Sequence, residues 1–366
     1  MRFLAALALL LLAAPGALAQ DRYSEPRECE TPTYYAPVCL TDRVWTAAEA
    51  ERLLGARDEV AFSQGDTLNV IARQAHGPVY LCCTIETALT RIEGSDLWVL
   101  SAHVLDLDRA VIDIQLSPPA KTLTAYYGAN VPKPATVERL LGTLVEETIP
   151  SAALGEQRRL TIYLPPGYDK SQHYGVVYMA DGSVLPAYAP AIEAGIIAGR
   201  SRPLIVVGIW PGQGDPAARA REYLVGHSFG RYRHHNQFVI DEVMPFVEGK
   251  YGASAQKDDR MLAGFSDGAA WALSTGLRHP DLFGSVAAFS LGWVPAADGI
   301  GSDGRPRLYL AAGVLEPDFG RTTARAARRA EGSDAPVRFE EFGSGHTLVA
   351  WQTMLLDALA WGFPRR

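Results

Sequence analysis

Two short segments of the sequence contain a serine that could act as a nucleophile. Both have the pattern G-x-S-x-G, one over residues 226–230 around Ser228 and one over residues 264–268 around Ser266. The pattern has chemical meaning only where a strand ends, turns sharply and starts a helix, because that strained turn raises the serine hydroxyl above the sheet. A serine at such a turn can attack an ester carbonyl once a base takes its proton.

The residues around Ser266 fit this turn better than those around Ser228. Residues 260–263 (RMLA) are typical of a strand entering the turn, and the small residues 268–270 allow the next helix to pack closely on neighbouring strands. Ser228 follows a polar loop at 211–221, and the residues after it are rich in arginine and histidine. We therefore predict Ser266 as the nucleophile and a charged loop around Ser228.

One histidine is well placed to be the base. Where this turn occurs in known hydrolases, an acid and then a histidine follow the serine along the chain. Only His279 and His346 follow Ser266, and His279 ends the helix after the nucleophile. His346 lies in a glycine-containing loop between a predicted strand at 337–342 and the last helix. Such a loop lies at the carboxyl edge of a parallel sheet, so we predict His346 as the general base.

The acid of the set should follow a strand between these two residues. The predicted strand 308–312 leads to Glu316, which would accept the Nδ1 proton of His346 and stabilise the imidazolium. Asp318 lies two residues further on and could do the same. We favour Glu316 because it is nearer to the end of the strand.

The tetrahedral intermediate of ester hydrolysis needs two backbone N–H donors. The amide of Asp267, directly after the nucleophile, should be one of them. The other should come from the turn at 178–183, where Gly182 allows close approach of the backbone and the amide of Gly182 or Ser183 could point inward.

The elements that would position these residues alternate between strands and helices from Arg159 onward. Strands are predicted at 160–164, 174–179, 203–209, 261–263, 286–290, 308–312 and 337–342, and helices at 238–251, 269–278 and 348–361. This alternation predicts an α/β fold with an open, mostly parallel sheet and helices on both faces.

The first third of the chain has a different pattern. Short strand-like runs occur at 67–72, 79–85, 97–104 and 110–116, and one helix is predicted at 47–54. Thr46 and Glu49 form a capping box at the start of this helix. We interpret residues 20–145 as a small β-sandwich-like domain and residues 146–366 as the catalytic domain, with a proline-containing linker at 130–134.

Residues 1–19 have the three parts of a secretory signal peptide: a positive start at Arg2, an apolar run at 3–14 and a small-x-small cleavage pattern at 17–19. The expected location is periplasmic or secreted. The four cysteines lie in the first quarter of the chain at Cys29, Cys39, Cys82 and Cys83. Because a bridge between adjacent cysteines would be strained, Cys29 and Cys39 are expected to bond either to each other or to the adjacent pair.

The charge of the chain argues against some partners. The net charge is −7, or −8 once Arg2 is removed with the leader, which disfavours nucleic acid or an anionic membrane surface as the main partner. No segment after the leader is long enough to span a membrane. No cofactor and no metal are expected, since adjacent cysteines lack the spacing of a zinc site.

Several segments occur in an order that is characteristic of one family. They are residues 158–168 (RRLTIYLPPGY), 178–182 (YMADG), 221–223 (REY), 262–268 (LAGFSDG), 279–284 (HPDLFG) and 345–351 (GHTLVAW). Over roughly residues 145–363 the chain resembles the esterase branch of the α/β-hydrolases, which includes enterochelin esterases, esterase D-type enzymes and feruloyl or acetylxylan esterases. The resemblance implies an α/β-hydrolase fold with its elbow at Ser266. The N-terminal part, most clearly at residues 90–98 (TRIEGSDLW), is similar to the immunoglobulin-like domain that precedes the catalytic domain of enterochelin esterases.

The expected function is hydrolysis of a small-molecule or carbohydrate-linked carboxylic ester through an acyl-enzyme. Predicted substrate contacts near the mouth are Arg221, Tyr223 and Trp293. Arginines at 219, 221, 231 and 233 would favour an anionic or phenolic substrate. Two alternatives remain: acyl transfer to an alcohol by the same residues, and a non-catalytic binding protein built on a hydrolase scaffold.

Overall fold

The structure is a computed structural model, and it describes residues 38–82, 84–117, 124–131, 133–213, 215, 217–294 and 300–365. The predicted leader, Cys29 and Cys83 lie outside these ranges. Cys39 is disulfide-bonded. The side chains of the three other cysteines are not described, so the predicted pairing stays a prediction. Within the described ranges, no helix is both long enough and apolar enough to cross a membrane.

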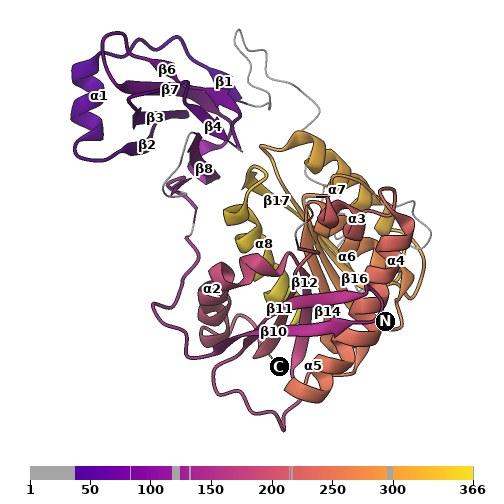
Figure 1. Cartoon of the computed structure of the whole chain (residues 1–366). Helices are drawn as coiled ribbons and strands as arrows, with labels where there is room; N and C mark the ends of the chain where they lie inside the picture. The colour runs from indigo at the N-terminus through magenta and orange to yellow at the C-terminus, as the bar shows by residue number, and fades with distance from the viewer. Residues whose placement is uncertain are drawn as a thin grey trace, which may run out of the picture.

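A large, mostly parallel sheet forms the centre of the C-terminal part (Figure 1). Its order is β10 (Thr143–Ser151), β11 (Glu156–Leu164), β13 (Leu204–Ile209), β12 (Gly175–Ala180), β14 (Arg260–Phe265), β15 (Ser285–Phe289), β16 (Arg307–Gly313) and β17 (Val337–Ser344). The strands from β13 to β17 pair in parallel, whereas β10 and β11 are antiparallel. The predicted α/β fold with an open sheet is confirmed.

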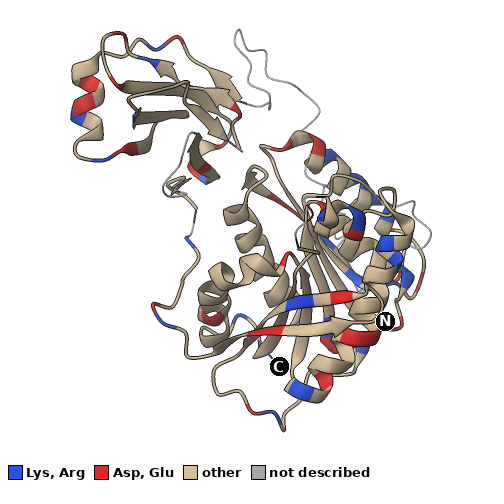
Figure 2. Cartoon of the chain, viewed as in Figure 1, with Lys and Arg blue, Asp and Glu red and all other residues tan. Residues whose placement is uncertain are grey.

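Helices cover both faces of this sheet, as the alternation of elements predicts. One face packs against α2 (Leu185–Ile197) and α8 (Leu348–Gly362). The other face carries α3 (Ala218–Tyr223), α4 (Phe229–Gln237), α5 (Met244–Tyr251), α6 (Asp267–Arg278) and α7 (Pro317–Ala330). Figure 2 shows charged residues on the outer helices, while the central parallel strands are almost uncharged. Burial of these strands on both faces explains their near-continuous apolar sequence.

The N-terminal part is a β-rich domain of two sheets. The first contains β1 (Val38–Leu40), β2 (Glu59–Gln64), β3 (Thr67–Arg73), β6 (Thr90–Arg91) and β7 (Leu97–Val104), and the second contains β4 (Tyr80–Cys82), β5 (Thr87–Ala88), β8 (Ala110–Ser117) and β9 (Thr124–Tyr127). Side chains from both sheets share one core, and the helix α1 (Ala47–Leu54) starts at the Thr46 cap. The predicted domain boundary at 145 lies inside β10, which begins at Thr143.

The two parts meet where β8 pairs in parallel with the end of β17. This pairing makes the second N-terminal sheet continuous with the large C-terminal sheet. A Cβ added to Gly345 would lie 2.7 Å from the Thr84 Cα, which shows how closely the N-terminal domain approaches this loop. Val314 and Leu315 belong to the core of the N-terminal domain. The domain therefore contacts the two loops that carry the predicted acid and base.

A buried carboxylate lies at this junction. Asp113 of β8 is 4% exposed, and its Oδ1 atom has no hydrogen-bond partner among the described residues. Burial raises the pKa of Asp113 to about 6, although a hydrogen bond with Thr347 opposes the rise. Burial, and the nearby Asp113 carboxylate, raise the pKa of Tyr127 and of Tyr188 above the ordinary tyrosine value, so neither side chain titrates near neutrality.

We expect the stability of Asp113→Asn to increase relative to that of the wild type as the pH rises. The pKa of Asp113 in the folded chain, about 6, lies above its ordinary value of 3.8. Its contribution to stability is therefore complete below about pH 4 and is lost as the pH rises through about 6. Urea unfolding of both proteins between pH 4.5 and 8 should show the difference in free energy of unfolding shift towards the variant by about 2 kcal/mol. Parallel pH profiles of the two proteins would contradict this expectation.

Candidate active site

Ser266 lies on a sharp turn between a strand and a helix. The strand β14 ends at Phe265, Ser266 has φ 56° and ψ −124°, and α6 begins at Asp267. Positive φ is costly for a residue with a side chain and is typical of functional turns. A Cβ on Gly264 would lie 2.2 Å from the Gly268 carbonyl oxygen, and one on Gly268 would lie 2.8 Å from the Ala180 Cβ. Close packing therefore requires both glycines of the motif.

Three predicted residues come together at the carboxyl edge of the sheet. His346 Nε2 lies 3.0 Å from the Ser266 hydroxyl, and His346 Nδ1 lies 2.7 Å from Glu316 Oε2. With Nδ1 protonated, the histidine donates to Glu316, and Ser266 donates to Nε2. Asp318, the alternative acid, is 80% exposed and pairs with Arg321 instead.

The Glu316 carboxylate is buried, and its hydrogen bonds compensate for that burial. Its side chain is 1% exposed, and Oε1 accepts from the Gly313 amide at 2.7 Å and from the Ser290 hydroxyl at 2.5 Å. The Ser290 oxygen in turn accepts from the Trp351 indole at 2.8 Å. Sequence reasoning did not assign a role to Ser290 or Trp351. These contacts fix the direction in which Glu316 faces His346.

Aromatic rings hold the imidazole of His346 in place. Phe319 stacks on it with ring centroids 4.0 Å apart, and Trp351 meets it edge to face at 4.7 Å and 87°. Trp351 itself stacks on Phe265 at 4.2 Å. The histidine side chain is 21% exposed, so it remains open to solvent on one side.

The two predicted sources of N–H donors lie on neighbouring segments, because a Cβ added to Gly268 would lie 3.2 Å from the Asp181 Oδ2 atom. Gly182 starts a short 3-10 helix directly after β12, and Asp267 starts α6. Amides at the start of a helix have no carbonyl partner within it. A Cβ on Gly182 would lie 2.4 Å from the Gly208 carbonyl oxygen, so only glycine fits there. Gly182 is buried and Ser183 is exposed; which of the two amides points inward stays a prediction.

The predicted substrate contacts have three different environments. Tyr223 is 1% exposed, and its hydroxyl accepts the Asp181 amide at 3.0 Å, so the prediction of a substrate contact at Tyr223 is wrong. Arg221 is 41% exposed and pairs with Asp215. Trp293 lies just beyond β15 and is 44% exposed, and it remains a candidate contact.

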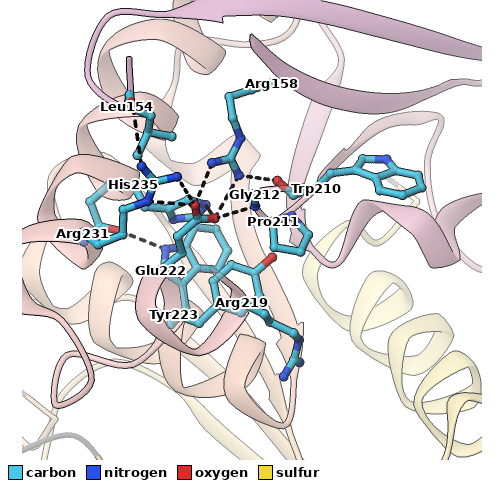
Figure 3. Close-up of polar contacts among 12 residues, drawn as sticks. Leu154, Arg158, Trp210, Pro211, Gly212, Arg219, Glu222, Tyr223, Arg231 and His235 are labelled. Atoms are coloured by element: carbon cyan, nitrogen blue, oxygen red, sulfur yellow. Dashed lines mark hydrogen bonds and ion pairs between the residues drawn. The ribbon is translucent and has the colours of Figure 1, made fainter. Parts of the chain in front are cut away.

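Arg219 and Arg231, two of the arginines expected to favour an anionic or phenolic substrate, are paired with carboxylates. Arg231 donates to Glu222 at 2.7 Å, and Arg158 donates to the same carboxylate at 2.8 and 2.9 Å (Figure 3). Burial alone would raise the pKa of Glu222, but Arg158, His235 and Arg231 outweigh it and bring the pKa to about 2. Arg219 is held by two aspartates. Neither Arg219 nor Arg231 is free to attract a substrate, contrary to the sequence-based expectation.

Ser228 has a different surrounding from the one predicted. The residues after it form α4, not a charged loop, and Ser228 is the N-cap whose hydroxyl accepts the Arg231 amide at 3.3 Å. Its φ of −159° is ordinary extended backbone. Ser228 lines a hollow of about 250 Å³ whose described lining contains neither Ser266 nor His346.

The α/β fold, together with a family match over residues 151–361, identifies the chain as a carboxylic ester hydrolase of the α/β-hydrolase type. Residues 151–361 match the family described as "Putative esterase", and the chain belongs to that family. It is 25% identical over 238 residues to the protein named "Uncharacterized protein YjcH" of Bacillus subtilis, which covers 60% of this chain and 96% of that protein. It is also 25% identical to an endo-1,4-beta-xylanase/feruloyl esterase of Xylanibacter ruminicola, covering 58% of this chain but only 30% of that longer protein.

Solved structures share the fold over both domains. The enterobactin esterase of Shigella flexneri superposes with a TM-score of 0.65 at 17% identity, covering 85% of this chain and 98% of that one. The ferric enterobactin esterase of Salmonella typhimurium gives a TM-score of 0.66 at 17% identity, covering 85% of this chain and 98% of that one. At these identities the likeness concerns the fold.

Proposed function

We propose that this protein hydrolyses its ester through an acyl-enzyme on Ser266. The observation that carries the proposal is the hydrogen-bonded chain from Ser266 through His346 to Glu316, with distances of 3.0 and 2.7 Å. A serine on a strained turn, next to a histidine whose other nitrogen meets a buried carboxylate, is the arrangement that nucleophilic acyl transfer needs.

The chemistry would proceed in two halves. His346 takes the Ser266 proton as Oγ attacks the carbonyl carbon, and Glu316 stabilises the imidazolium that forms. The oxyanion faces the amides of Asp267 and of Gly182 or Ser183. Collapse of this intermediate releases the alcohol, which takes the proton from His346. Water, activated by the same histidine, then attacks the acyl carbonyl and releases the acid, so that Ser266 is regenerated.

The proposed substrate is a small-molecule or carbohydrate-linked ester, which the protein would hydrolyse outside the cytoplasm. Trp293 offers an exposed aromatic surface on a loop at the carboxyl edge of the sheet, where ligands bind in open α/β folds. Export rests on the signal-peptide pattern of residues 1–19 and on the disulfide at Cys39, since disulfides persist in oxidising compartments.

A fluorophosphonate probe tests the proposal directly. We expect it to add once to the folded protein, on the tryptic peptide Met261–Arg278 that contains Ser266, and not on Glu222–Arg231, which contains Ser228. Ser228→Ala should still be labelled and Ser266→Ala should not. The mass of the intact protein isolated from its host should correspond to a chain without residues 1–19. Folded protein that takes no label would favour the binding-protein alternative.

A further inference from the structure

The guanidinium of Arg219 connects two segments of the candidate site. Its Nε and Nη2 atoms each donate to Asp181 at 2.8 Å, and its Nη1 atom donates to Asp267 at 2.7 Å. Asp181 lies in the turn after β12, and Asp267 is the first residue of α6. One side chain from α3 therefore ties the end of one strand to the start of the nucleophile helix.

These two segments are the ones that carry the proposed N–H donors. Asp267 offers its own amide, and Asp181 directly precedes Gly182 and Ser183. The backbone of Asp181 has φ 59° and ψ 55°, a left-handed conformation that is uncommon for a residue with a side chain. Tyr223, on the same helix as Arg219, accepts the Asp181 amide at 3.0 Å. The helix α3 thus holds this turn at both its carboxylate and its backbone.

The helix α3 is itself anchored from its other side. It spans six residues, and Glu222 binds the Gly212 amide at 3.1 Å in addition to Arg158 and Arg231. Figure 3 shows Arg219 extending away from this cluster. Because the Glu222 carboxylate is fully buried, a shift of α3 would leave a buried charge with fewer partners. The helix α3, which carries Arg219, is therefore held in a fixed position.

Charge gives Arg219 a second effect. Two carboxylates close to a developing oxyanion would repel it, and the repulsion is strong where water is excluded. The Asp181 side chain is 9% exposed, and burial raises its pKa while Arg219 opposes the rise. The single guanidinium, shared between the two aspartates, offsets part of their negative charge.

We propose that Arg219 is a positioning residue for the oxyanion site. It fixes the spacing between the turn at 181–183 and the start of α6, and it offsets part of the charge of Asp181 and Asp267. Arg219 acts through these aspartates rather than on the substrate. The inference rests on the proposed acyl-enzyme function.

The test compares three variants of the full-length protein. Arg219→Gln removes the charge and the bidentate contact, and Arg219→Lys keeps the charge but makes only a point contact. Arg200→Gln is the matched control, because it breaks an exposed arginine–aspartate pair with Asp357. For each we would measure kcat and KM on p-nitrophenyl butyrate and the Ki of a trifluoromethyl ketone, which forms a tetrahedral adduct with the serine. The end-point of fluorophosphonate labelling gives the active fraction.

We expect kcat of Arg219→Gln to fall about 100-fold, the cost of a small misplacement at a reacting centre. KM should stay within about threefold, because the lost interaction belongs to the transition state. The Ki of the ketone should weaken by the same factor as kcat/KM, which a smaller folded fraction cannot produce. Arg219→Lys should recover part of the rate, with a kcat about 10-fold below that of the wild type. If Arg219→Gln does not fold, this lysine variant alone tests the inference.

Two results would overturn the inference. One is a kcat within about threefold of the Arg200→Gln control in both Arg219 variants. The other is a loss of kcat with an unchanged Ki for the ketone. A wild type that hydrolyses no ester and takes no label would instead overturn the proposed function, and this inference with it.

Discussion

Ser266→Ala is expected to hydrolyse p-nitrophenyl acetate and butyrate at least about a thousandfold more slowly than the wild type. The variant keeps the backbone turn and the packing of both motif glycines, because alanine differs from serine only by the hydroxyl. It removes the one oxygen that lies 3.0 Å from His346 Nε2. Without that oxygen no acyl-enzyme can form, and any remaining rate comes from binding and from the N–H donors alone.

Ser228→Ala is the matched control, because Ser228 has the same sequence pattern and a different role. It loses the cap of α4, which typically costs about 1 kcal/mol of stability. Its rate should stay close to that of the wild type once folding is checked by circular dichroism. If Ser266→Ala keeps its activity while Ser228→Ala loses it, the nucleophile has been assigned to the wrong motif.

The parts of the site that sequence predicted are those with a local signal. Ser266 could be found because the strand, the turn and the small residues of the helix are adjacent in sequence. Glu316 and His346 could be found because each follows a strand in an order that the chemistry requires. Ser290 and Trp351 could not be found in this way. Ser290, which donates to Glu316, lies 26 residues from it in sequence, and Trp351, which donates to Ser290, lies 61 residues from Ser290.

The helices α2 and α7 were not among the helices predicted from the sequence, and they show the limit of hydrophobic periodicity. The buried residues of α7 are glycine, threonine and alanine, so its core-facing side lacks the large apolar residues that reveal an amphipathic helix. The helix α2 is apolar on nearly all sides and contains Pro190, so it has no polar face to define a period. The environment of Tyr223 could not be predicted either, because its hydroxyl accepts a hydrogen bond from the backbone amide of Asp181, which is distant in sequence.

Glu316→Gln is expected to lower kcat by on the order of 10⁴-fold, even though glutamine has nearly the same shape. The Glu316 oxygen that faces Gly313 and Ser290 accepts two hydrogen bonds, and the Gly313 amide can only donate. The glutamine oxygen should therefore stay on that side, which leaves its NH₂ group facing His346 Nδ1. The histidine must then accept at Nδ1 and carry its proton on Nε2, where it cannot take the proton of Ser266.

Asp318→Asn is the control that separates the two acids considered for this site. Asp318 is 80% exposed and pairs with Arg321 at the surface, so its loss should leave the rate unchanged and cost less than about 1 kcal/mol of stability. Rates of both variants on the same ester, with thermal unfolding to check the fold, decide the assignment. If Asp318→Asn were the slower of the two, the acid would be Asp318. The expected order follows from burial: a carboxylate can hold the tautomer of His346 only where water does not compete for its oxygens.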